Sequence, residues 1–143
     1  MIDFPDTPFG VTVTADQIVE TMQNCDGWEE RYRTVIQMGK KLPPMPEPLK
    51  QDLVTIAGCE SKVWLHHQKR DDIYHFCADS DARIVRGLIA LVMAALNHKT
   101  AQQIQDFDTE AYFEQLGMVA HLSPSRGNGL RAIVEQIKQI TAN

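Results

Sequence analysis

The chain has 143 residues, a length that suits one domain with a single core, so we expect one domain over residues 1–143. Its 14 basic and 19 acidic residues give a net charge of −5, which argues against a nucleic acid partner because phosphate binding needs a basic patch. The longest apolar run, "GLIALVMAAL" at 87–96, is too short for a membrane span, and "MIDFPDTPFG" lacks the features of a secretory leader, so we expect a cytoplasmic protein without a membrane partner.

The first third of the chain predicts two helices and then a stiff, extended segment. Thr14 opens "TADQIVETMQN" and has capping-box spacing with Gln17, so a helix of about two turns should follow. The stretch "DGWEERYRTVIQMGK" predicts a second helix, capped by Asp26 and ended by Gly39. The prolines of "LPPMPEPLK" then require an extended crossing.

The middle of the chain predicts a β-hairpin followed by a buried helix. The runs "SKVWLHHQ" at 61–68 and "DIYHFCADS" at 72–80 are rich in strand-forming residues and are separated by the charged "KRDD". The run "DLVTIAG" at 52–58 is a candidate third strand. The stretch "SDARIVRGLIALVMAALNHK" predicts a central helix with a broad apolar face, capped by Ser80 or Asp79.

The last third predicts helices only. Two short ones are expected at "TAQQIQDF" and "DTEAYFEQLG", and a longer one begins with Ser123 as its cap and Pro124 at its first position. The whole order is helix, helix, small antiparallel sheet, then helices. This order predicts an α+β fold in which a small antiparallel sheet packs against helices.

The cysteines stand at positions 25, 59 and 77, with no CxxC pair, which indicates reduced thiols rather than a disulfide framework. Cys59 lies in "IAGCESKVW", where Gly58 permits a tight turn that would lift the next side chain outward. Glu60 would raise the pKa of this thiol and Lys62 would lower it, so the sequence shows no self-activated nucleophile. Buried packing, metal ligation and nucleophilic attack on a partner all remain open.

Four ordered stretches carry a resemblance to a known family. They are "WEERYRTVIQMGKKLPPMPE", "IAGCESKVW", "ADSDARIVRGLIA" and "HLSPSRGNGL", and they resemble successive signature blocks of the SufE family of sulfur acceptors. The resemblance runs from about residue 8 to the end, and "PFGVTVTA" is closer to the CsdE branch of the family. It implies a fold shared with the iron–sulfur scaffold IscU, no cofactor, and a PLP-dependent cysteine desulfurase as partner.

The resemblance also implies residue roles. Cys59 would take sulfane sulfur from the desulfurase persulfide, stimulate that enzyme and pass the sulfur to a downstream acceptor protein, for iron–sulfur cluster assembly or tRNA modification. Arg126 matches a recurrent arginine of the family, and its charge opposes the dipole of the last helix, which favours a site role. Four further residues are expected to support the loop or the contact with the partner. Three of them are neighbours of Cys59 and one stands at the start of the central helix: Gly58, Glu60, Ser61 and Asp81. The family usually has glycine at the position of Ala78, so we expect a small change in a loop there.

Two alternatives differ from the acceptor interpretation. In the first, Cys59 binds a metal ion together with residues of the hairpin, as an iron–sulfur scaffold would: His66, His67, His75 and Cys77. His75 and Cys77 share one strand face, but none of the closed structural zinc spacings is present. In the second, the protein is an interaction module with no chemistry. A stand-alone enzyme is not expected, because the chain lacks a Schiff-base lysine motif and a dinucleotide motif.

Overall fold

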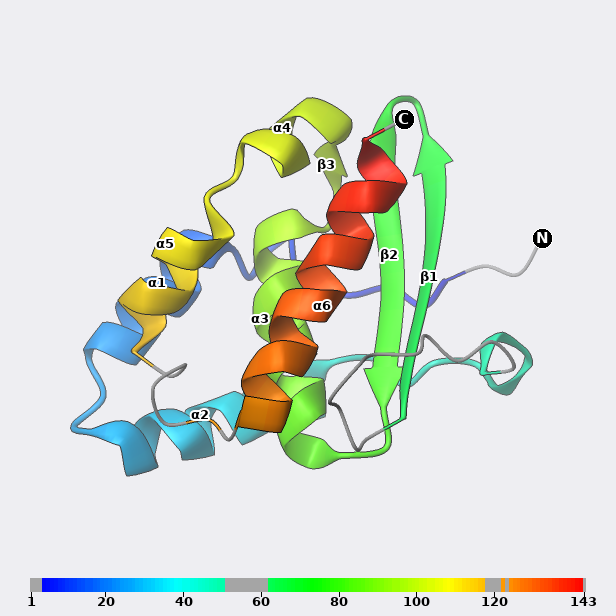
Figure 1. Cartoon of the computed structure of the whole chain (residues 1–143). Helices are drawn as coiled ribbons and strands as arrows, with labels where there is room; N and C mark the ends of the chain where they lie inside the picture. Colours follow the sequence, from blue (N-terminus) through cyan, green and yellow to red (C-terminus); the bar gives the residue numbers. More distant parts are fainter. Residues whose placement is uncertain (1–3, 51–61, 118–121, 123, 143) are drawn as a thin grey trace.

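The order of the elements along the chain is that of an α+β protein, as predicted. The computed structural model describes residues 4–50, 62–117, 122 and 124–142, but not the side chains of 124–126 and 128. The elements are α1 (Ala15–Gln23), α2 (Trp28–Lys41), η1 (Glu47–Leu49), β1 (Val63–Arg70), β2 (Ile73–Ser80), α3 (Arg83–Leu96), β3 (Lys99–Thr100), α4 (Ala101–Asp106), α5 (Thr109–Leu116) and α6 (Pro124–Thr141). The three strands form one antiparallel sheet in the order β1-β2-β3 (Figure 1).

The predicted hairpin is confirmed, with a tighter turn than the sequence indicated. Strands β1 and β2 pair along their whole length, and only Asp71 and Asp72 connect them. Both turn residues have positive φ, +53° and +67°, a geometry that matches the right-handed twist of the flanking strands. Lys69 and Arg70, expected in the turn, therefore belong to β1. The candidate strand at 52–58 lies outside the described residues, and the third strand of the sheet is β3.

Helix α3 is the centre of the core. Every residue of α3 except Arg83 and Arg86 is buried, and the helix contacts α1, α2, α6 and the sheet (Figure 1). Its predicted cap was wrong, since its N-cap is Ala82, which has no side-chain capping bond. Ser80 and Asp79 still belong to β2, because both side chains are used by partners at the strand end.

Helix α2 continues to Lys41, so the prediction that Gly39 ends it was wrong. Gly39 is instead the point at which α2 touches α3. A Cβ atom at Gly39 would lie 2.7 Å from the backbone nitrogen of Gly87, and one at Gly87 would collide with the carbonyl oxygen of Val35. The two glycines therefore allow the two helix backbones to meet without side chains between them.

The helix starts agree with the sequence in one case and differ in another. Thr14 and Gln17 form the predicted capping box of α1. Asp26 does not cap α2, because the N-cap is Gly27, whose φ of +92° suits glycine. The backbone N–H of Asp26 instead donates to Glu30 at 2.7 Å, so an acidic side chain of the helix closes the turn that precedes it.

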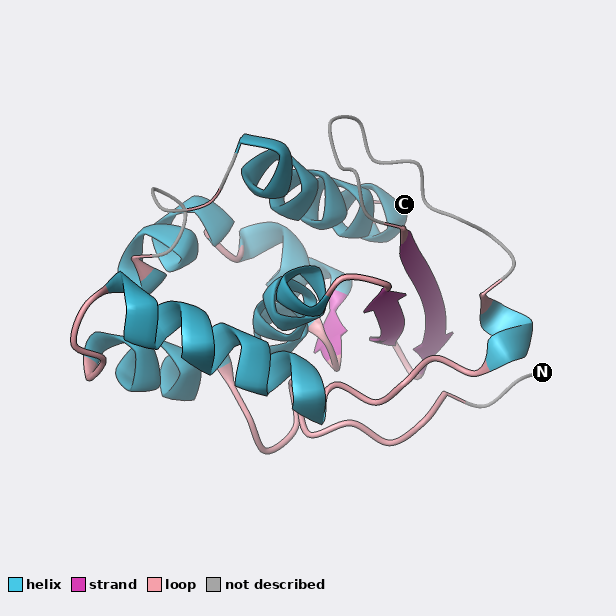
Figure 2. Ribbon diagram, turned by 90° about the horizontal axis from the view of Figure 1, so that it is seen from below, coloured by secondary structure: helices cyan, strands magenta, loops and turns pink. Residues whose placement is uncertain are grey.

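The sheet separates two apolar clusters of unequal size. Tyr74, Phe76 and Ala78 face the helices and belong to the main core. Ala78 thus lies in a strand, opposite Leu65 of β1, and not in a loop as expected. On the other face, η1 and the proline-rich segment form a smaller cluster around Met45, Leu49 and Cys77, with Phe4 and Trp64 packed on it (Figure 2). Within the described ranges, no helix has the length and apolar character to cross a membrane.

Candidate functional site

The structure describes the chain on both sides of the predicted site. Gly58, Cys59, Glu60 and Ser61 lie outside the described residues, which stop at Lys50 and resume at Lys62. The two described ends show where the chain that carries these residues departs from the fold and where it returns.

The upstream flank is bound to the sheet by both main-chain and side-chain contacts. The backbone N–H of Met45 donates to Asp79 Oδ2 at 3.0 Å. The carbonyl oxygen of Leu49 accepts from His66 Nε2 at 2.6 Å, and Lys50 Nζ lies 3.9 Å from the Asp79 carboxylate. The proline-rich segment is therefore held against β1 and β2 up to its last described residue.

The downstream flank is fixed to the same strand end. Lys62 donates its backbone N–H to Asp81 Oδ1 at 3.0 Å, and its carbonyl oxygen accepts from Ser80 Oγ at 2.7 Å and from the Asp81 N–H at 3.3 Å. Asp81 thus binds the downstream flank directly, and its expected role in supporting the loop or the partner stays a prediction. The chain leaves the described fold beside Asp79 and re-enters it beside Ser80 and Asp81.

A buried ion pair supports this strand end. Asp79 is 2% exposed and pairs with Arg86 of α3, which is 21% exposed. The Arg86 guanidinium also donates to the carbonyl oxygens of Leu42 at 2.6 Å and Gly39 at 3.2 Å. These carbonyls belong to the C-terminal end of α2, where a cation complements the helix dipole. One arginine thus connects α2, α3 and β2 beneath the predicted site.

Sequence reasoning missed the role of Arg86. The available signal was a cation inside the apolar run that follows Arg83, because a charge at such a position needs a buried partner. Asp79 was interpreted as a cap, although its carboxylate accepts from Arg86, seven residues further on, and from Met45, which is far away in sequence. Neither partner is visible in a local pattern.

The two described cysteines are poor candidates for a nucleophile. Cys77 is buried in β2, and burial, reinforced by the charge of Asp79, raises the pKa of its thiol to about 11. The thiol is therefore protonated near neutral pH, and only the thiolate attacks. Cys25 is half-buried at the end of α1, where its Sγ donates to the Thr21 carbonyl at 3.4 Å and lies 3.6 Å from Thr34 Oγ1.

Trp64 lies in β1, two residues after Lys62 and opposite Asp79 of β2. The Lys50 ammonium lies 5.3 Å from the centre of its ring, a cation–π arrangement. Its buried Nε1 has no hydrogen-bond partner among the residues that the structure describes. A buried indole N–H without a partner costs free energy. The Trp64 N–H is therefore available as a donor to a segment or molecule that covers this side chain.

The histidines of the hairpin do not gather into one site. His66 is bonded to Leu49, whereas His67 lies on the opposite face beside Tyr74, with ring centroids 6.4 Å apart. Across the described ranges, no three His, Cys, Asp or Glu side chains are placed to hold a metal ion. A metal site built on the hairpin would need Cys59, which lies outside those ranges, and would have to compete with Leu49 for His66.

Arg126 lies in the first turn of α6, where its charge opposes the helix dipole as the sequence indicated. Its side chain is not among those described. The predicted cap of α6, Ser123, also lies outside the described residues, while the predicted start at Pro124 is confirmed.

Comparison with known proteins places the chain in a family. The family model described as "SufE: Fe-S metabolism associated domain" matches residues 16–141. The Sulfur acceptor protein CsdE of Escherichia coli K12 is 44% identical over 135 residues, covering 94% of this chain and 92% of that protein. An uncharacterized SufE-like protein of Rhizobium meliloti is 42% identical over 127 residues, covering 86% of this chain and 91% of its own. The solution structure of a hypothetical protein from Thermus thermophilus has the same fold, with a TM-score of 0.73 at 16% identity and coverage of 90% and 93%.

Proposed function

Because this chain belongs to the SufE family, we propose that it is a sulfur acceptor that takes sulfane sulfur from a cysteine desulfurase onto Cys59. The observation that carries the proposal is the similarity to CsdE, which extends over 94% of the chain and nearly the whole of a protein named as a sulfur acceptor. The single domain expected over residues 1–143 is part of the same proposal.

The reaction is an exchange at sulfur. The Cys59 thiolate attacks the outer sulfur of the persulfide on the desulfurase cysteine, a new S–S bond forms on Cys59, and the thiolate of the desulfurase leaves. One S–S bond is broken and an equivalent one is formed, so no oxidant or reductant is consumed. The rate depends on the thiolate fraction, the pKa of the leaving thiol and access to the persulfide. No cofactor is required on the acceptor, and PLP belongs to the partner.

The geometry around the flanks supports this assignment. The chain that carries Cys59 is held at its two ends by neighbouring residues, Asp79 on one side and Ser80 with Asp81 on the other. Such an arrangement allows a segment to be presented to a partner while the fold below it stays fixed. Cys77, buried and protonated, offers no competing thiolate. We assign Gly58, Glu60 and Ser61 to the presentation of the thiol, and Asp81 and Arg126 to support of the loop or partner.

The partner in this proposal is a PLP-dependent cysteine desulfurase whose turnover the acceptor stimulates. The sulfur then passes to a second acceptor protein, in iron–sulfur cluster assembly or in tRNA modification. The description of the matched family as associated with Fe–S metabolism favours the first of these routes.

The proposal is tested by intact mass spectrometry after incubation with a cysteine desulfurase, cysteine and PLP. We expect a mass gain of one or more sulfur atoms, mapped by digestion to the peptide that contains Cys59. The variants Cys25→Ser and Cys77→Ser should gain the same mass, and Cys59→Ser should not. Sulfur on Cys25 or Cys77 in the native chain would refute the site assignment. Undiminished stimulation of the desulfurase by Cys59→Ala would identify an interaction module instead of an acceptor.

A further inference from the structure

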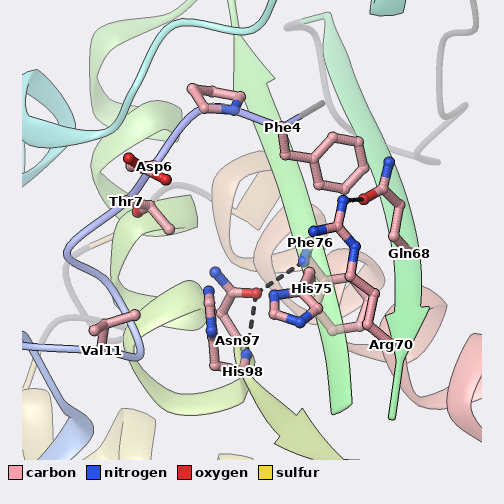
Figure 3. Close-up of a pocket in the computed structure, with 11 residues that line it drawn as sticks. Phe4, Asp6, Thr7, Val11, Gln68, Arg70, His75, Phe76, Asn97 and His98 are labelled. Carbon is pink, nitrogen blue, oxygen red and sulfur yellow. Dashed lines mark hydrogen bonds between the residues drawn. The ribbon is translucent and has the colours of Figure 1, made fainter. Parts of the chain in front are cut away.

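A cavity of about 600 Å³ opens toward the hairpin end of the sheet (Figure 3). Its lining comes from the N-terminal segment, β1, β2 and the turn between α3 and β3. The volume falls in the range of pockets that hold small molecules. The polar side chains in its wall are Asp6, Thr7, Gln68, Arg70, His75, Asn97 and His98.

Two imidazoles meet in this cavity. The rings of His75 and His98 are edge to face, with centroids 4.3 Å apart and planes at 79°. The main chain of His98 is fixed from below, because its N–H donates to the Tyr74 carbonyl at 3.0 Å and to Asn97 Oδ1 at 3.1 Å. Asn97 is itself buried, and the same oxygen accepts from the Phe76 N–H at 2.8 Å. A buried amide therefore holds the turn that presents His98 to His75.

A guanidinium stands beside the His75 ring (Figure 3). Gln68 pairs with His75 across the strands, and Arg70 is two residues further on the same face of β1. Arg70 Nη2 donates to Gln68 Oε1 at 2.8 Å, which orients the guanidinium over the cavity. The wall thus brings three basic side chains together from three elements.

Each of the two imidazoles has neighbours that carry positive charge. Burial and then the charge of Arg70 lower the pKa of His75. Burial and then the charges of His75 and Lys99 lower the pKa of His98. Each basic group thus disfavours charge on its neighbours. Asp6, exposed in the N-terminal segment, is the acidic residue among those that line the cavity.

We infer that this cavity binds a small molecule through an oxyanion, a carboxylate or a phosphate, held by Arg70, His75 and His98. A guanidinium can donate two parallel hydrogen bonds to such a group, and the imidazoles add N–H donors from the same wall. The site lies at the far end of β1 from Lys62, roughly 20 Å away by the rise of the strand. The inference does not rest on the proposed sulfur-acceptor function.

The proposal fixes the direction of the pH dependence. A bound anion favours the charged imidazoles, so binding takes up protons on the protein, and the affinity for an anion that keeps its own charge rises as pH falls from 7.5 to 5.5. The charged groups that act on the two rings from the packed elements are Arg70 of β1 and Lys99 of β3, and Asp6 of the N-terminal segment lines the same cavity. A metal ion held by the same histidines requires neutral rings, so the affinity for the metal would decrease as the pH falls.

The test is an NMR titration of the histidine side chains in the full chain, with inorganic phosphate or malonate against chloride at constant ionic strength. We expect both anions, or phosphate alone, to raise the titration midpoints of His75 and His98 by about half a pH unit or more. His67, on the opposite face of β1, serves as the internal control and should not move. Midpoints that shift with phosphate but not with malonate would indicate that the ligand binds through a phosphate group.

Matched variants separate a built site from general surface charge. Arg70→Gln should weaken the phosphate affinity about tenfold, the ratio expected for the loss of charged hydrogen bonds. Lys69→Gln removes the same charge from the neighbouring position on the opposite face, and it should change the affinity less than about twofold. The inference is overturned if neither anion moves His75 and His98, if His67 moves equally, or if zinc binds and neither anion does.

Discussion

Arg86 binds Asp79 through one of its nitrogens and the carbonyl end of α2 through another, so one side chain joins the strand end to the helix that precedes the proline-rich segment. Asp79 in turn accepts the backbone N–H of Met45. The ion pair therefore contacts the upstream flank of the segment that carries Cys59 directly, and Ser80, the next residue of β2, contacts the downstream flank at Lys62.

Asp79→Asn should destabilise the fold by about 2–4 kcal/mol, because it leaves the mostly buried charge of Arg86 without its counter-ion. Urea unfolding followed by circular dichroism measures the change. Glu110→Gln is the matched control, since it breaks the exposed pair with Arg131, where the side chains are 64% and 48% exposed. That control should lose less than about 1 kcal/mol. Equal losses in the two variants would contradict a structural role for the Asp79 pair.

Gly87→Ala should destabilise the protein by about 1–3 kcal/mol, because the new methyl group would collide with the main chain of α2 at Val35. The free energy of unfolding measures it. Gly127→Ala is the control in α6, where the nearest described atom to the new Cβ is Arg131 Nη1 at 3.9 Å. There the change should be neutral or stabilising by up to about 1 kcal/mol, as alanine favours helix. A neutral Gly87→Ala would show that α2 and α3 can separate freely.

Cys77 should be almost unreactive toward iodoacetamide at pH 8 in the native protein. With a pKa of about 11, its thiolate fraction is more than about a hundredfold below that of an ordinary cysteine, before burial is considered. The rate should rise about tenfold per pH unit towards that pKa, and it should become ordinary in urea. Peptide mapping of the labelled thiols checks this, with Cys25 in the same sample as the control. Native labelling of Cys77 at the rate of Cys25 would contradict the buried packing of β2.

Local patterns were sufficient for much of this fold. The capping box of Thr14 and Gln17 and the proline start of α6 use residues within four positions of each other, and the structure confirms both. The alternation of the hairpin predicted β1 and β2 for the same reason, since side chains on one face recur every second residue. These features are decided by neighbours along the chain.

The errors arose where a residue is used by a partner far away in sequence. Glycine is typical of a helix end, but at Gly39 the missing side chain allows the close contact of the main chain with Gly87. Asp79 has the position of a cap, but its carboxylate binds Arg86 and Met45. The meeting of His75 and His98 likewise depends on the turn after α3 and could not be read from either neighbourhood. The loop around Cys59 stays a prediction from its signature, and the contacts of Asp79 and Ser80 with its described flanks were found only in the structure.

The contact of Asp81 with Lys62 should control how well Cys59 accepts sulfur. Asp81→Ala removes the acceptor of the Lys62 N–H, whereas Asp81→Asn removes only the charge and keeps an oxygen at the same place. If the flank positions the thiol, the alanine variant should take up sulfur from a desulfurase about fivefold more slowly, the ratio that corresponds to one lost hydrogen bond. The asparagine variant should stay close to the native rate. Time-resolved intact mass spectrometry gives both rates, and Asp71→Asn in the hairpin turn controls for the change in net charge, because asparagine tolerates the positive φ there. Equal rates for the alanine and asparagine variants would mean that this flank does not position Cys59.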